Sequence, residues 1–155
     1  MMKYLLTCVI VLFLFGCGGG RQLATPAELQ PWVGKWIGTG IRENQNSPPN
    51  VWTLELRIDG DRLAGEMSDE QGEMNHARIM SVKLKNGALS FKVRHESMRG
   101  LIIFHSHRAQ LKGHKLLSEY EGMEGGRSFR GKWEAKLIHE AEKSADEKNV
   151  ISEKP

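Results

Sequence analysis

The strongest constraint on the fold is a strict alternation of apolar and polar residues in short stretches of the chain. In the clearest stretch one face would carry Trp52, Leu54, Leu56 and Ile58, and the other Thr53, Glu55 and Arg57. Successive side chains of a strand point to opposite sides, so this pattern is typical of a half-buried β-strand. The exported part of the chain is therefore expected to be all-β.

Turn residues separate these stretches at fairly even spacing. Asp59-Gly60-Asp61 and Asn86-Gly87 are the strongest signals, because Asn-Gly suits the positive φ angles of a two-residue hairpin loop. The pattern predicts about eight strands, at 32–41, 51–58, 62–67, 76–84, 88–94, 101–111, 115–120 and 127–136. Sequential hairpins favour an antiparallel up-and-down barrel, which leaves no free sheet edge, and a flattened sandwich is the alternative.

The first seventeen residues have the organisation of an export signal. A positive start at Lys3 precedes the uncharged, mostly apolar run 4–15, and small residues follow at once. The sequence Leu14-Phe15-Gly16-Cys17 resembles the lipobox of bacterial lipoproteins, although Phe15 departs from the usual small residue. The resemblance implies cleavage before Cys17 and lipidation of that cysteine. Twelve apolar residues span only about 18 Å, too short for a transmembrane anchor.

These features divide the chain into four segments. We expect a signal peptide at 1–16, the lipidated Cys17 with a flexible tether at 17–31, a barrel at 32–137 and a charged tail at 138–155, helical or disordered. No acidic residue directly follows Cys17, so resemblance to lipoprotein sorting rules favours the outer membrane, facing the periplasm, if the host has two membranes.

Charge and cysteine content exclude several classes of function. The 22 basic and 19 acidic residues give a net charge of +3, and the sequence has no clustered basic run of the kind that a nucleic-acid backbone requires. Both cysteines, Cys8 and Cys17, lie in the export signal, so the exported domain has no thiol pair for a disulfide. Without a nucleophile motif or a phosphate loop, we expect no enzyme.

The start of the expected barrel resembles the first strand of calycin barrels, the lipocalin-like group. The resemblance rests on Gly34-Lys35-Trp36-Ile37-Gly38-Thr39-Gly40, which contains the Gly-x-Trp of that group. It implies that Trp36 plugs one end of an eight-stranded barrel while the glycines let the strand bend. The same run is similar to the start of nitrobindin-type haem barrels. The later motifs of that family are not evident, so haem is a minor alternative and no cofactor is predicted.

Two histidines are the most informative polar residues of the expected barrel. His105 and His107 fall on one face at a spacing of two, so both would point inward. Such a pair can chelate zinc or copper only with a third ligand, for which His76 or Glu119 would have to reach it. Hydrogen bonding to neighbours or water is the stronger interpretation, and no metal site is predicted.

The barrel interior allows two hypotheses. In the first, a small apolar or amphipathic ligand lies among aromatic residues and a few polar groups, which are Trp36, Trp52, His105, His107, Ser118, Tyr120 and Trp133. In the second, these residues simply fill the barrel, and its outer face around Ile102 and Phe104 binds a protein of the cell envelope. The sequence alone does not choose between them.

Overall fold

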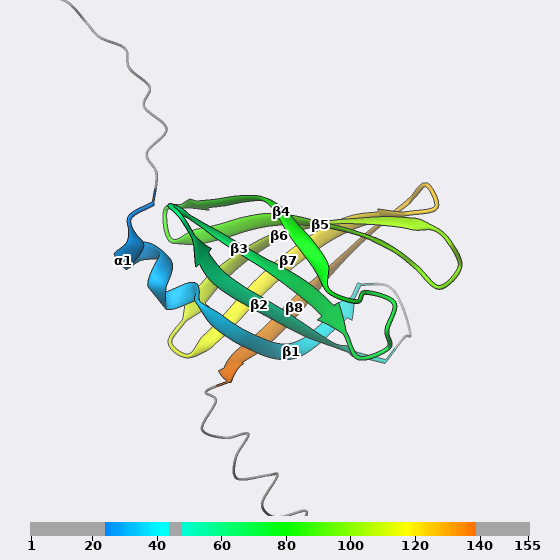
Figure 1. Cartoon of the computed structure of the whole chain (residues 1–155). Helices are drawn as coiled ribbons and strands as arrows, with labels where there is room; N and C mark the ends of the chain where they lie inside the picture. Colours follow the sequence, from blue (N-terminus) through cyan, green and yellow to red (C-terminus); the bar gives the residue numbers. More distant parts are fainter. Residues whose placement is uncertain (1–23, 44–47, 139–155) are drawn as a thin grey trace, which may run out of the picture.

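The computed structural model describes residues 24–43 and 48–138, which form one short helical segment and eight strands (Figure 1). The elements in chain order are α1 (Pro26–Leu29), the 3-10 helix η1 (Gln30–Trp32), β1 (Gly34–Arg42), β2 (Asn50–Asp59), β3 (Arg62–Asp69), β4 (Ala77–Lys85), β5 (Ala88–Glu96), β6 (Ile102–Lys112), β7 (Lys115–Glu124) and β8 (Arg127–Ile138).

The strands close into an antiparallel up-and-down barrel in which each strand pairs with its sequence neighbours and β1 pairs with β8. The predicted fold class is confirmed, and the predicted strands match the observed ones to within a few residues. The largest difference is at β7, which runs on to Glu124 where the prediction ended it at Tyr120. The glycine-rich connection is therefore a tight turn at Gly125 and Gly126, both with positive φ.

The expected flexible tether is wrong for its last residues, because α1 and η1 are ordered against the barrel. Thr25 caps α1: its hydroxyl accepts a 3.4 Å hydrogen bond from the backbone N–H of Glu28, and Glu28 in return accepts one from the Thr25 backbone. Leu29 and Trp32 are only 3% exposed and belong to the core. Apolar burial therefore fixes this segment, whereas residues 1–23, with the signal peptide and Cys17, lie outside the described part of the chain.

The up-and-down order gives the barrel two distinct ends. The α1 end carries α1, η1 and the turns 59–62, 85–88 and 112–115, and the loop end carries the longer connections 43–49, 70–76 and 97–101. Apolar side chains fill the α1 end, among them Trp36, Leu56, Leu89 and Leu116. Polar and aromatic side chains fill the loop end, as described below.

Closure of the barrel is weakest between β3 and β4. These two strands pair only at Glu66 with Arg78 and at Met67 with Ala77. Beyond that point β4 has an irregular register between Met80 and Lys83, with Ser81 at a φ of 53°. Such a bulge bends a strand, so the end of β4 separates from the start of β3 near α1.

Candidate functional site

Five of the predicted ligand-binding residues meet in one aromatic cluster inside the barrel. Trp52 lies at its centre, with ring centroids 4.9 Å from Tyr120, 5.9 Å from His105 and from His107, and 6.1 Å from Trp133. Phe91 stacks on His107 at 4.6 Å with the rings nearly parallel. These are contact distances for aromatic pairs, so the rings fill this part of the barrel.

Of the other two predicted residues, Trp36 lies outside the contacts of that cluster, and Ser118 is in register with Trp133. The indole Nε1 of Trp36 donates a 2.9 Å hydrogen bond to the carbonyl oxygen of Trp32, which holds η1 against the α1 end. The buried hydroxyl of Ser118 donates to the neighbouring Glu119 carbonyl at 3.3 Å. Trp36 therefore closes one end of the barrel, as the calycin resemblance implied, and Ser118 is bonded to the backbone.

A third histidine joins the cluster, and the sequence analysis did not connect it with the other two. His95 lies on β5, with its Nε2 3.2 Å from Nε2 of His105 and its Nδ1 3.1 Å from the carbonyl oxygen of Glu73. Because a carbonyl only accepts, Nδ1 of His95 donates to Glu73, and in the neutral form of His95 its Nε2 accepts from Nε2 of His105. Its position on the same inward face as Phe91 and Val93 was the available signal.

Several nitrogens of the cluster have no hydrogen-bond partner among the residues that the structure describes. They are Nδ1 of His105, both ring nitrogens of His107 and the indole Nε1 of Trp133, all of them buried. Burial of an unpaired polar group costs about 1–3 kcal/mol. The closed aromatic cluster is therefore a costly arrangement, held by the packing around it.

Burial also determines the protonation of this region. Desolvation, followed by the charges of His95 and Arg42, lowers the pKa of His105 to about 3, and desolvation and His105 lower the pKa of His107 well below its ordinary value. Desolvation raises the pKa of Tyr120 to about 12. These shifts favour the neutral forms of all three groups at pH 7.

The proposed third metal ligands do not reach the histidine pair. The side chain of His76 is 68% exposed and contacts Glu66, and Glu119 lies on the outer face of β7. Within residues 24–43 and 48–138, no group of three or more His, Cys, Asp or Glu side chains is arranged to hold a metal ion. The same residues include no helix long and apolar enough to cross a bilayer.

A cleft of about 900 Å³ opens where β3 and β4 separate beneath α1 and η1. We call it the strand cleft. Its apolar wall is made of Leu29, Trp32, Leu63, Val82, Leu84 and Leu89, four of which are core residues at most 3% exposed. The sequence analysis missed this site because it needs a bulge in β4 and a helix that was expected to be a tether.

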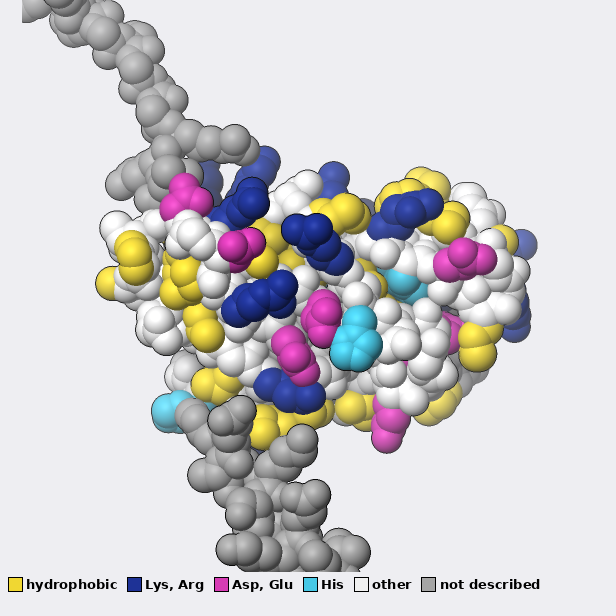
Figure 2. Space-filling view, in the orientation of Figure 1, with side chains coloured by type: hydrophobic (Ala, Val, Ile, Leu, Met, Phe, Trp, Pro, Cys, Tyr) yellow, Lys and Arg dark blue, Asp and Glu magenta, His cyan; other side chains and the backbone are white. Residues whose placement is uncertain are grey.

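Charged residues surround the entrance of the strand cleft. Arg62, Lys83 and Lys85 are exposed there and form no ion pair with a described carboxylate. Of the two carboxylates at the rim, Asp61 lies in the turn and Glu28 is bonded to Thr25. In Figure 2, Lys and Arg side chains lie near hydrophobic atoms beside α1, with Asp and Glu side chains among them. The cleft is thus apolar inside and basic at its edge.

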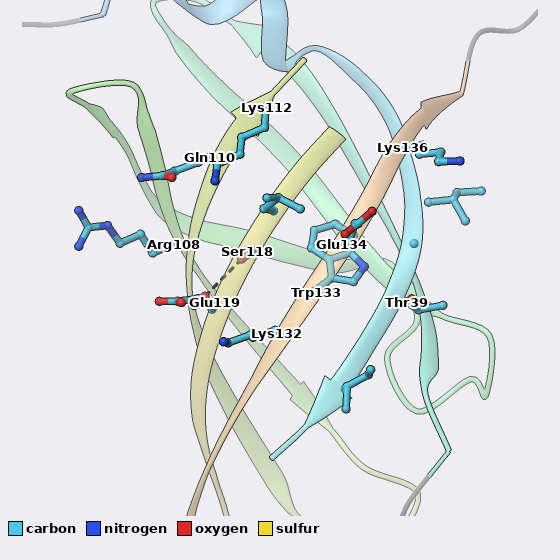
Figure 3. A pocket seen from close by; sticks show the side chains of 14 residues that line it. Thr39, Arg108, Gln110, Lys112, Ser118, Glu119, Lys132, Trp133, Glu134 and Lys136 are labelled. Atoms are coloured by element: carbon cyan, nitrogen blue, oxygen red, sulfur yellow. Dashed lines mark hydrogen bonds between the residues drawn. The ribbon is translucent and has the colours of Figure 1, made fainter. Parts of the chain in front are cut away.

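A second hollow, of about 780 Å³, lies on the outer surface of β6, β7, β8 and β1 (Figure 3). Cross-strand register arranges its charges in rows, with Glu119 between Arg108 and Lys132. Glu134, which is in register with Leu117, accepts a 2.6 Å hydrogen bond from Lys115. Ile37, Ile41 and Leu117 provide its apolar surface.

The outward orientation predicted for Ile102 and Phe104 is observed. Phe104 is 50% exposed and lies beside Met123 of β7, and Arg94 lies over its ring at 5.9 Å. The tail that could cover this surface, residues 139–155, lies outside the described part of the chain.

The closed up-and-down order of eight strands defines a calycin-like β-barrel protein. No family model matches the sequence, and no curated protein does either. Among solved structures, the barrel is similar to apo lipid binding protein 8 of Caenorhabditis elegans, with 14% identity and a TM-score of 0.37 over 68% of this chain and 95% of that one. So distant a likeness carries no information about ligands.

Proposed function

We propose that this protein is a lipid-anchored binding module that takes up a single-chain amphipathic molecule with an anionic end group in the strand cleft. The observation that carries the proposal is the cleft itself, which opens over the core where two strands have separated and leaves Val82 and Leu84 half-buried. The apolar chain of the ligand lies against Val82 and Leu84, the half-buried residues of the apolar wall. Its anionic end lies at Arg62, Lys83 and Lys85.

Size and lining support this assignment. Ligand sites commonly measure about 300–1,000 Å³ and combine apolar walls with a few polar groups, and the strand cleft has about 900 Å³. Burying apolar surface contributes roughly 0.8 kcal/mol per methylene. A chain of several methylenes therefore gains enough free energy to be held, and the cations at the rim select its orientation and charge.

The aromatic cluster is less suited to hold a ligand than the strand cleft. Its rings contact one another, and its unpartnered nitrogens are already buried. A guest would have to displace aromatic side chains there, whereas the strand cleft needs no such movement. We therefore place the proposed ligand in the strand cleft at the α1 end of the barrel, and not in the aromatic cluster that the sequence had favoured.

Anchoring is the second part of the proposal. It is supported by the sequence Leu14-Phe15-Gly16-Cys17 behind an apolar run, which resembles a lipobox. Acyl chains on Cys17 would hold the protein at a membrane of the cell envelope, the outer one in a host with two membranes. Mass spectrometry of the purified protein tests this, because a lipidated product starts at Cys17 and a Cys17→Ser variant does not acquire the lipid mass.

Ligand binding is tested in solution with the fluorescent fatty acid 11-(dansylamino)undecanoic acid. We expect saturable binding that Leu84→Trp, which fills the strand cleft, weakens at least tenfold. The double variant Arg62→Glu/Lys83→Glu should weaken it as well, and the same dansyl chain ending in an alcohol should bind less tightly. Leu117→Trp in the outer hollow is the matched control and should bind like the wild type.

Two outcomes would reject the strand cleft as the site. If Leu84→Trp binds the probe as tightly as the wild type, the ligand lies elsewhere. If His105→Ala/His107→Ala abolishes binding while Leu84→Trp does not, the aromatic cluster is the site and the original sequence hypothesis is right.

A further inference from the structure

Exposed cations are concentrated at the α1 end of the barrel. The turns and strand ends there carry Arg57, Arg62, Lys83, Lys85, Lys112, Lys115 and Lys136, all of them exposed. The carboxylates of the same end are Glu28, Glu55, Asp59, Asp61 and Glu134, of which Glu55 pairs with Lys35 and Glu134 with Lys115, and Glu28 is bonded to Thr25 in capping α1. Among the described residues of this end, cations therefore outnumber carboxylates.

The loop end has the opposite balance. Its described residues include Glu43, Asp69, Glu70, Glu73 and Glu96 against Arg94, Arg99 and Arg127. Arg42, which also lies there, is paired with Glu124 at 3.1 Å. The charge of the barrel is therefore polarised along its axis, although the whole chain is nearly balanced.

Three lysines at the α1 end are direct neighbours across strands. Lys115 is in register with Lys112 on β6 and with Lys136 on β8. Like charges directly opposite each other on a sheet are destabilising, and among the described residues only Lys115 of the three has a carboxylate partner, Glu134. Figure 3 shows Lys112 and Lys136 extending from the outer surface. An anionic surface outside the protein would relieve this repulsion.

The α1 end is also where the N-terminal segment joins the barrel and where the strand cleft opens. We infer that the α1 end binds an anionic phospholipid surface, with its cations on the headgroups and the entrance of the strand cleft facing the bilayer. The charge asymmetry supports this contact independently of any ligand. In this orientation a ligand could pass directly from the bilayer into the strand cleft, and that part of the inference rests on the proposed function.

The strength of membrane binding depends on the number of cations that approach the anionic surface. Each Lys or Arg near an anionic membrane contributes about 1 kcal/mol, which is roughly a fivefold change in binding. Reversing two of them should therefore weaken binding by more than tenfold. The attraction is screened at high ionic strength, because the Debye length falls to about 3 Å at 1 M salt.

The experiment is co-sedimentation of the full chain with vesicles of phosphatidylcholine alone, or of phosphatidylcholine with 30% phosphatidylglycerol. Any binding through the uncharged run 4–15 would be common to both kinds of vesicle, so the readout is the preference for phosphatidylglycerol. We expect at least a tenfold preference that is lost at high salt and lost in Lys112→Glu/Lys136→Glu. The matched control at the loop end is Arg94→Glu/Arg99→Glu, which should keep the preference.

Equal binding to both kinds of vesicle would overturn the inference, as would an equal loss of preference in both double variants. Retained preference in Lys112→Glu/Lys136→Glu would do the same, because the cations of the α1 end would then not be responsible. Binding of the dansyl fatty acid in the absence of vesicles is measured on the same variants. Failure of the ligand proposal is thereby distinguished from failure of the membrane contact.

Discussion

The indole of Trp36 is hydrogen-bonded to the carbonyl oxygen of Trp32, four residues earlier, at 2.9 Å. Both side chains are at most 3% exposed. This one bond connects the first strand of the barrel to the segment that closes its α1 end. Because that segment also forms a wall of the strand cleft, the bond stabilises the fold and the proposed site together.

We expect Trp36→Phe to destabilise the protein by more than Trp133→Phe. Both changes replace a buried indole by a smaller ring, but Trp36 loses a hydrogen bond, whereas Nε1 of Trp133 has no partner among the described residues. The difference should be about 1–2 kcal/mol. Urea denaturation of the two variants measures it, and equal losses would show that the Trp36 bond contributes nothing.

Replacing His107 by phenylalanine should stabilise the protein by about 1–3 kcal/mol. The new ring keeps the stacking on Phe91 and removes two buried nitrogens that no described group pairs with. His105→Phe is the control, because it leaves Nε2 of His95 without its partner and should not stabilise. A His107→Phe protein less stable than the wild type would mean that His107 has a bonding partner in solution.

Stability should fall as the pH drops from about 6.5 toward 3. His105 has a pKa of about 3 in the folded protein, and His107 also has a lowered pKa, against about 6.5 for an unfolded histidine. The unfolded chain therefore binds more protons in this range, and acid favours unfolding. Melting temperatures between pH 7 and pH 4 should decline less in His107→Phe than in the wild type. Equal declines in melting temperature would show that His107 does not contribute to the acid sensitivity.

A methyl group at Gly38 should be poorly tolerated. The Cβ of an alanine there would lie 1.8 Å from the carbonyl oxygen of Glu134, where β1 and β8 close the barrel. We expect Gly38→Ala to lower the free energy of unfolding by about 3 kcal/mol or more through overpacking. Gly113→Ala is the comparison, since it has a positive φ of 59° but no atom within 4 Å, and should cost about 1–2 kcal/mol. A milder effect at Gly38 than at Gly113, in thermal unfolding, would contradict the close approach.

Much of the aromatic cluster could be predicted from the sequence, but its contacts and chemistry could not. Alternation placed Trp52, His105, His107, Tyr120 and Trp133 on inward faces, and the structure brings them into contact. It could not show that His95 contacts His105, since that depends on the register between β5 and β6. The sequence also left open whether these rings line a pocket or fill the barrel.

The sequence by itself determined the barrel, because period-two burial and turn residues are local properties that act over a few residues at a time. It also determined the closure of one end by Trp36, through a motif in a single strand. Only the tertiary structure decided the strand cleft and the basic α1 end. Both depend on side chains from strands far apart in sequence, on the bulge at Ser81 and on the burial of Leu29 and Trp32, which no local pattern specifies.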